Sequence, residues 1–310
     1  NLNEYIKGSN TARWWTVGLS VMATQASAIT FLSTPGQAFH DGMGFVQFYF
    51  GLPFAMIIIC IFFVPIYNKL KVFTAYQFLE DRFDKKTRKL TAILFLIQRG
   101  LAAGITIYAP AIILSVVLNW DLRITALVVG SLVILYTLVG GTRAVNMTQK
   151  LQMFIIFSGM FLAFYFIITN FPNQISFLDA ISIAGKAEKL SFLDFSINLK
   201  SRYTFWSGIT GGLFLSLSYF GTDQSQVQRY LSGKSLRESQ IGLIMNGFLK
   251  VPMQFFILFT GVMVFVFYQF EVAPLNFNPK AVSAVKESNQ SDKFLKLENE
   301  NIDTQKQIRY

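Results

Sequence analysis

The chain has 310 residues, of which 53% are hydrophobic and only 14% are charged, and its formal net charge is +10 at pH 7. Ordinary soluble domains carry about a quarter of charged residues, so this composition indicates a chain whose surroundings are mostly lipid. A single cysteine, Cys60, excludes disulfides and cysteine metal clusters, and a single histidine, His40, removes most metal and acid–base centres.

A helix needs about 20 apolar residues to cross a hydrocarbon layer about 30 Å thick. Several stretches of the chain meet that length, and their hydrophobicity is continuous rather than alternating, which favours helices over barrel strands. They predict an all-α integral membrane protein and exclude a soluble enzyme. Seven such spans are expected, at about 14–38, 45–67, 90–118, 123–140, 151–170, 203–222 and 240–270.

The basic residues lie mostly in alternate loops between these spans. Cytoplasmic loops carry an excess of lysine and arginine, so the asymmetry predicts a multi-pass protein of the cell membrane with residue 1 on the cytoplasmic side. The positive charge is therefore a signal of topology. No basic patch interleaved with aromatic residues points to nucleic acid, which is not expected as a partner.

The first and sixth spans are more polar than the others. The first reads WWTVGLSVMATQASAITFLSTPGQAF, and the sixth, YTFWSGITGGLFLSLSYFGTDQ, contains four glycines. Such interrupted spans in corresponding halves of a transporter indicate helices that break near the membrane midplane. Unwound backbone there leaves carbonyl oxygens that can replace the water shell of a cation. We expect breaks within 23–30 and 207–218; the alternative is that the small residues only allow close helix packing.

Five motifs point to a known family: GTDQSQVQRYLSGKS (221–235), FTAYQFLEDRFDKKTRKL (73–90), WWTVGLSVMATQASAITF (14–31), YAPAIILS (108–115) and YTLVGGTRAVNMTQKLQ (136–152). Together they resemble the sodium:solute symporter family, over most of the chain from Leu2 to Phe270. The resemblance implies the LeuT-type fold, a bundle of five plus five helices in inverted repeats. The details are similar to the branch that carries monocarboxylates, vitamins, iodide and sialic acid.

The same resemblance predicts how the chain is organised. Relatives usually have a further helix before the bundle and a complete second repeat, and both that helix and the rest of the second repeat are expected to be missing here. The expected segments are a cytoplasmic lead-in at 1–13, the first five-helix repeat at 14–170, an extracellular loop at 171–202, the first two helices of the second repeat at 203–270, and a polar, helical, extracellular segment at 271–310.

Site residues are also implied by the resemblance. A sodium ion, Na+, is expected at the backbone carbonyls of Ala23 and Ala26, with its remaining ligands beyond Tyr310. Substrate contacts are expected from the first span, at Gln25, Ser27 and Thr30, and from two aromatic positions that line the cavity or a second ion site, Tyr108 and Trp206.

Charged residues near or inside the spans have two interpretations each. Arg99 lies about ten residues into the third span, where a charge costs about 2.5–3.5 kcal/mol. It is either a guanidinium fork for a substrate carboxylate or a side chain that snorkels or pairs with a carboxylate. Lys250 is expected to be structural and to reach the inner face. Asp223, with Arg229, is expected to form an intracellular gate, or Asp223 caps a helix.

These features predict a sodium-coupled secondary symporter that works by alternating access. Its solute is expected to be a small organic anion of the monocarboxylate, vitamin or sialic acid type, Na+ is the co-transported ion, and no organic cofactor is expected. The absence of a nucleophile–base pair or phosphate loop indicates that the protein is not an enzyme. The expected partners are the solute and the lipid bilayer, around a monomeric transport unit. Alternatives are a solute-sensing domain of a signalling protein, a sugar-carrying symporter, or a passive channel.

Overall fold

The computed structural model describes residues 11–26, 28–70, 74–198 and 200–308. Within these ranges the chain forms helices, and its β structure is limited to one isolated bridge between Ala12 and Gly233. The prediction of an all-α protein is therefore confirmed. The helices are α2 (Trp14–Gln25), α3 (Ala28–Asp41), η2 (Met43–Tyr49), α4 (Leu52–Ile58), η3 (Ile59–Phe63), α5 (Val64–Lys69), α6 (Gln77–Arg82), α7 (Lys85–Leu118), α8 (Leu122–Thr169), α9 (Phe177–Lys186), α10 (Phe205–Thr222), α11 (Gln224–Leu231), α12 (Leu236–Phe270), α13 (Pro279–Lys286) and α14 (Ser291–Ile308).

Five described helical stretches are long and apolar enough to cross a membrane: Met43–Lys69, Lys85–Leu118, Leu122–Thr142, Ala144–Thr169 and Leu236–Phe270. A sixth is added if the bent pair of α2 and α3 forms one broken span, with a 60° bend between its halves. The seventh expected span, α10, is an 18-residue helix that does not belong to this set. Its glycine, serine and threonine residues make it more polar than the other five.

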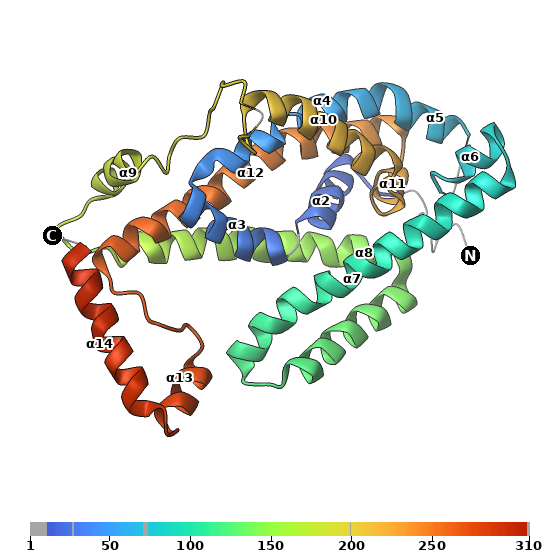
Figure 1. The fold of residues 1–310 in the computed structure, drawn as a ribbon. Helices are drawn as coiled ribbons and strands as arrows, with labels where there is room; N and C mark the ends of the chain where they lie inside the picture. The colour runs from blue at the N-terminus through green and yellow to red at the C-terminus, as the bar shows by residue number, and fades with distance from the viewer. Residues whose placement is uncertain (1–10, 27, 71–73, 199, 309–310) are drawn as a thin grey trace.

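The fourth and fifth expected spans form one helical run, α8, and the expected loop between them is absent from the described chain. Gly141 alone interrupts this run, with φ +53° and ψ −151°. A side chain at positive φ is strained, whereas glycine tolerates it. The glycine therefore lets the two spans join at a sharp kink. Figure 1 shows α7 and the first half of α8 as a hairpin, and α7 also contacts α6 and α3.

α12 is the central helix of the part of the chain that the structure describes. It packs against α2, α3, η2 and α4, and it buries Leu243, Ile257 and Val262. Figure 1 shows α4 and α10 side by side along one edge of this group, and α13 and α14 as a second hairpin at the C-terminal end. The described segment after α12 thus contains two helices, α13 and α14.

The sixth span does not break as predicted. α10 is a regular helix from Phe205 to Thr222, so the expected interruption within 207–218 is wrong. Its glycines serve the alternative role, because a Cβ at Gly208 or Gly212 would lie 2.0 or 2.3 Å from a backbone oxygen of η2. These two glycines let the backbone of α10 touch the second span directly, as small residues do between membrane helices.

Candidate functional site

The first span is broken where its sequence predicts. α2 ends at Gln25, and Ala26 has a non-helical conformation with φ −86° and ψ 80°. The N–H of Ala26 still donates to the carbonyl of Met22 at 2.9 Å. A helix leaves its last four carbonyl groups without partners inside that helix. In a continuous span, the next turn would supply N–H groups to these carbonyl oxygens. At the break, backbone oxygens in the last turn of α2 lose those partners.

The two alanines expected to hold sodium face a common space. Ala23 and Ala26 line a cleft of about 760 Å³ between the broken span, α7, α8 and α12. Side chains of Thr24, Gln149 and Thr260 line the same cleft. Carbonyl, hydroxyl and amide oxygens suit hard cations and can replace a hydration shell. Ala23, Ala26 and these polar residues line one space, and their oxygens belong to the class of ligands that would hold a sodium ion there.

A ring of hydrogen bonds joins α2 to α8 beside this cleft. The Ser20 hydroxyl donates to Gln149 Oε1 at 2.5 Å, Gln149 Nε2 donates to Thr24 Oγ1 at 2.9 Å, and the Thr24 hydroxyl donates to the Ser20 carbonyl at 2.7 Å. Asn146 Oδ1 lies 2.7 Å from the same Ser20 hydroxyl. The ring positions the last turn of α2, and with it the backbone oxygens at the break.

A small cavity lies on the other side of the break, between the end of α2, η2 and α10. Its volume is about 130 Å³. The Oε1 atom of Gln25 is buried and has no hydrogen-bond partner among the described residues. An unsatisfied buried polar atom costs about 1–3 kcal/mol, so a hydrogen-bond donor in this cavity would stabilise the Gln25 oxygen. The lining residues are Gln25, Phe48, Tyr49, Leu215, Ser216, Tyr219 and Phe220.

Lys250 is the most unusual charged residue near this cavity. Its side chain is 0% exposed, and its Nζ has no hydrogen-bond partner within the described chain. Nζ lies 6.0 Å from the centre of the Tyr49 ring, which lines the cavity. Asn246 and Gln254, one turn to either side on α12, are also fully buried and carry unpaired polar atoms. The expectation that Lys250 reaches the inner face is wrong, because neighbouring helices enclose it.

Arg99 pairs with a carboxylate, which is one of its two interpretations. Its guanidinium forms an ion pair with Asp223, and its Cζ atom lies 5.4 Å from the centre of the Tyr219 ring. Asp223 also caps α11, because its Oδ1 accepts from the backbone N–H of Ser225 at 2.9 Å. One carboxylate thus fixes the start of α11 and holds an arginine from the third span.

Arg229 does not join Asp223 in the gate that the sequence suggests. Asp223 pairs with Arg99 instead. The Nε atom of Arg229 is buried without a hydrogen-bond partner in the described part of the chain, and burial lowers the pKa of its guanidinium to about 10. The predicted association of Asp223 with Arg229 is therefore wrong. Asp223, at the end of the sixth span, pairs with Arg99 of the third span.

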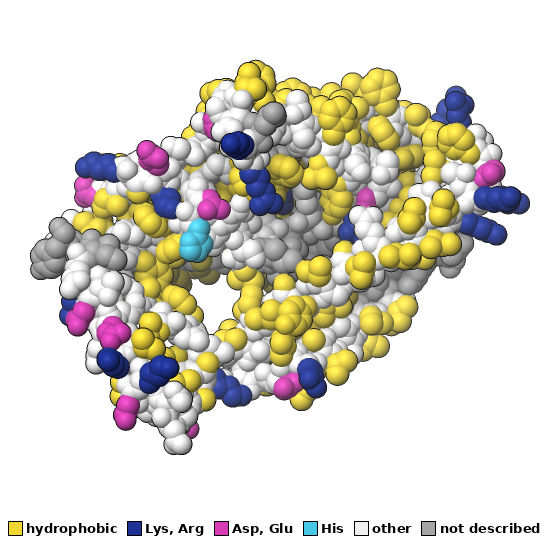
Figure 2. All heavy atoms as spheres, in the orientation of Figure 1, with side chains coloured by type: hydrophobic (Ala, Val, Ile, Leu, Met, Phe, Trp, Pro, Cys, Tyr) yellow, Lys and Arg dark blue, Asp and Glu magenta, His cyan; other side chains and the backbone are white. Residues whose placement is uncertain are grey.

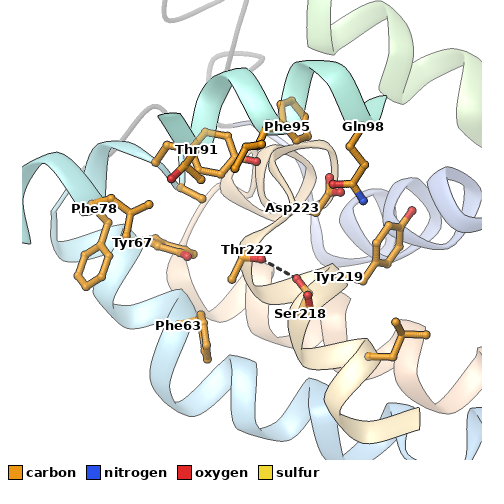
Figure 3. Close-up of a pocket in the computed structure, with 15 residues that line it drawn as sticks. Phe63, Tyr67, Phe78, Thr91, Phe95, Gln98, Ser218, Tyr219, Thr222 and Asp223 are labelled. Atoms are coloured by element: carbon orange, nitrogen blue, oxygen red, sulfur yellow. Dashed lines mark hydrogen bonds between the residues drawn. The ribbon is translucent and has the colours of Figure 1, made fainter. Parts of the chain in front are cut away.

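A second cleft, of about 520 Å³, lies between α5, α6, α7 and α10. Figure 3 shows Asp223 and Tyr219 on one wall of this cleft and Gln98 of α7 on the facing wall. Tyr219 and Leu215 line both this cleft and the 130 Å³ cavity. The Tyr219 side chain therefore lies between the two spaces, and Arg99 with Asp223 lies beside it.

Other expected substrate residues lie elsewhere. Tyr108 is 53% exposed on α7 and lines none of these spaces. Trp206 is 50% exposed, and its indole N–H donates to the carbonyl of Phe195 at 3.1 Å, which holds it against the segment before α10. Thr30 is half-buried in α3 and also lines none of them. Ser27 lies outside the described residues. The structure thus brings together Gln25 and the two alanines.

Sequence reasoning missed the polar ring and the buried lysine as parts of the site. A signal for the ring exists, since Ser20 and Thr24 are four residues apart and Asn146 and Gln149 are three apart. Such spacings place each pair on one helix face. The environment of Lys250 has no such signal, because it depends on which helices surround α12.

A broken membrane helix whose residues line a cleft, with a small, mostly apolar cavity beside it, is typical of secondary transporters. The family model described as sodium:solute symporter family matches residues 5–297. The chain belongs to this family, as its motifs predict. Because the family consists of transporters, this assignment also favours transport over catalysis.

Several characterised proteins are similar to the chain. It is 30% identical to the human sodium/iodide cotransporter over 272 residues, which cover 86% of this chain and 41% of that protein. It is 34% identical to the human sodium-coupled monocarboxylate transporter 1 over 243 residues, which cover 78% of this chain and 39% of that protein. The chain thus spans about two fifths of the length of these relatives.

A solved structure has a similar helix arrangement. It is the substrate-bound, outward-open state of a Na+-coupled sialic acid symporter, with a TM-score of 0.79 and 28% sequence identity. The match covers 89% of this chain and 57% of that one. The LeuT-type fold class is therefore confirmed.

Proposed function

We propose that the complete protein is a sodium-coupled symporter of a small organic anion. The observation that carries this proposal is Lys250, which is fully buried and whose Nζ has no hydrogen-bond partner among the described residues. Nζ lies 6.0 Å from the centre of the Tyr49 ring, which lines the same cavity as Gln25. A buried charge is costly unless an opposite charge accompanies it. A solute carboxylate in this cavity would supply that charge to a protonated Lys250 amine, whereas a neutral solute would not.

Sodium binds at the break in the first span, at the carbonyls of Ala23 and Ala26. Ala23, in the last turn of α2, and Ala26, which follows that helix, carry these carbonyls, and Gln25, which borders the solute cavity, lies between them in the chain. Sodium therefore orders the same turn that receives the solute. Coupling is a difference in affinity between two conformations, and each ligand raises the affinity for the other.

The inner gate consists of Tyr219, Arg99 and Asp223. Tyr219 separates the solute cavity from the second cleft, and the ion pair lies beside its ring. Release of the solute requires Tyr219 to move, which disturbs its contact with the Arg99 guanidinium. Each sodium that enters through about 100 mV contributes about 2.3 kcal/mol to this cycle, before its concentration gradient is counted.

The remaining expectations form part of the same proposal. Residue 1 lies on the cytoplasmic side of the cell membrane, the transport unit is a monomer, and no organic cofactor takes part. The anion is of the monocarboxylate, vitamin or sialic acid type. A solute-sensing domain and a sugar carrier are the competing functions: a sensor would bind the solute without net flux, and a sugar carrier would prefer a neutral solute.

The test is uptake by the complete protein in proteoliposomes. Lactate, sialic acid, iodide and glucose are supplied in parallel, with sodium outside or with choline in its place. We expect sodium-dependent uptake of an anion that decreases strongly in Gln25→Ala. Uptake that persists in choline indicates a passive channel, a preference for glucose indicates a sugar carrier, and binding without uptake indicates a sensor; each of these results contradicts the proposal.

A further inference from the structure

A group of exposed basic side chains lies where two membrane-spanning helices end on one side of the bundle. α5 ends at Lys69, and α7 begins at Lys85 with Lys86 and Lys89 in its first turns. These side chains and that of Arg82, at the end of α6, are all exposed. Figure 2 shows dark-blue side chains at the end of the molecule where Figure 1 places α5 and α6. We call these five residues the basic corner.

The acidic residues of this region do not neutralise the basic corner. Glu80 forms an ion pair with Arg88, which is not one of the five. The Asp84 carboxylate caps α7 by accepting from the backbone N–H of Thr87 at 2.6 Å, and this hydrogen bond lowers the pKa of Asp84. Asp81 is exposed. The five basic side chains outnumber the acidic ones that remain, so the corner keeps a positive potential.

Exposed apolar side chains lie among the basic ones. Phe83, between α6 and α7, is 68% exposed, and Leu90, where the apolar part of α7 starts, is 60% exposed. Leu70, next to the end of α5, is 42% exposed. Apolar side chains mixed with lysine and arginine are typical of surfaces that lie at the boundary between hydrocarbon and headgroups. The basic corner therefore has the composition of a membrane-interface site.

We infer that the basic corner binds the headgroups of anionic phospholipids. The corner lies where two spans leave the hydrocarbon layer, so the headgroups are its immediate neighbours. The α7 helix has 34 residues and is about 50 Å long, which places its lysine-rich first turns beyond a hydrocarbon layer about 30 Å thick. Each lysine or arginine close to an anionic membrane surface strengthens binding about fivefold. In the proposed orientation this is the cytoplasmic leaflet.

The test is lipid binding to the complete protein in a neutral detergent, measured by native mass spectrometry. Phosphatidylserine and phosphatidylcholine are added at equal concentration. The wild-type protein is expected to prefer phosphatidylserine by at least tenfold. The variant K85Q/K86Q/K89Q is expected to lose most of this preference. The matched control K280Q/K293Q/K296Q removes three exposed lysines from α13 and α14 and is expected to keep it.

A second variant changes binding in the opposite direction. Asp81→Lys removes an exposed acidic group and adds a basic one, so it is expected to raise the affinity for phosphatidylserine more than fivefold. Equal binding of the two lipids by the wild type, or equal loss in both triple variants, overturns the inference. The measurement involves no transport, so its result does not depend on the proposed symport.

Discussion

Replacing Lys250 by methionine removes a buried charge and keeps a side chain of similar length. The Lys250 side chain is 0% exposed, and its ammonium lacks a hydrogen-bond partner among the described residues. An apolar replacement of similar volume at a buried ionic position is neutral or stabilises a protein by about 1–4 kcal/mol. We therefore expect Lys250→Met to unfold at the same temperature as the wild type or higher when no solute is present.

The same substitution is expected to abolish binding of an anionic solute. Removing one partner of a buried, hydrogen-bonded charge pair costs about 2–5 kcal/mol. Because about 1.4 kcal/mol corresponds to tenfold in an equilibrium constant, the solute affinity should decrease by roughly 30-fold to several thousand-fold. Stability and affinity are thus expected to change in opposite directions, which a general folding defect cannot produce.

Two measurements on the complete protein check this reasoning. Thermal unfolding in detergent gives the stability, and sodium-dependent uptake of lactate in proteoliposomes gives the functional effect. Lys186→Met, at an exposed position on α9, is the matched control and should change neither. Wild-type uptake by Lys250→Met, or a large decrease in its unfolding temperature without solute, refutes the role given to this ammonium.

Three further predictions concern other parts of the site. Gly208→Ala places a Cβ 2.0 Å from a carbonyl oxygen of η2. It should therefore lower the unfolding temperature by an amount equivalent to about 1–3 kcal/mol. The control Gly211→Ala, with no atom within 4 Å of its Cβ, should leave the unfolding temperature unchanged. Asp223→Asn removes the ion pair with Arg99. Because the pair is only partly buried, the loss should cost about 1–3 kcal/mol in stability. Flux assays without solute should then detect a leak of sodium. Gln149→Leu opens the polar ring and should raise the sodium concentration for half-maximal uptake about tenfold; an unchanged value would exclude the ring as a positioning element.

Much of the fold follows from local properties of the sequence. Continuous apolar runs predict helices, and the polar run with a proline behind it in the first span predicts a break that the structure places at Ala26. The polar composition of 271–310 predicts a helical segment unlike the spans. These features depend on residues close together in the chain, so their physical causes are visible without tertiary structure.

The sixth span shows why composition alone misleads. A glycine can interrupt a helix, or it can let a neighbouring backbone approach the helix closely. The sequence looks the same in both cases. The choice depends on what lies opposite Gly208 and Gly212, namely the backbone of η2, about 160 residues earlier in the chain. Helix propensity therefore could not decide between a break and a close contact.

From the sequence by itself one can determine an all-α membrane protein, the broken first span and the family. Only the tertiary structure decided that Arg99 pairs with Asp223, 124 residues away, and that Lys250 is enclosed without a counter-charge among the residues that the structure describes. The physical reason is that hydrophobicity and backbone preferences are local properties. Desolvation and charge pairing instead depend on which distant helices pack together, and that packing sets the chemistry of the site.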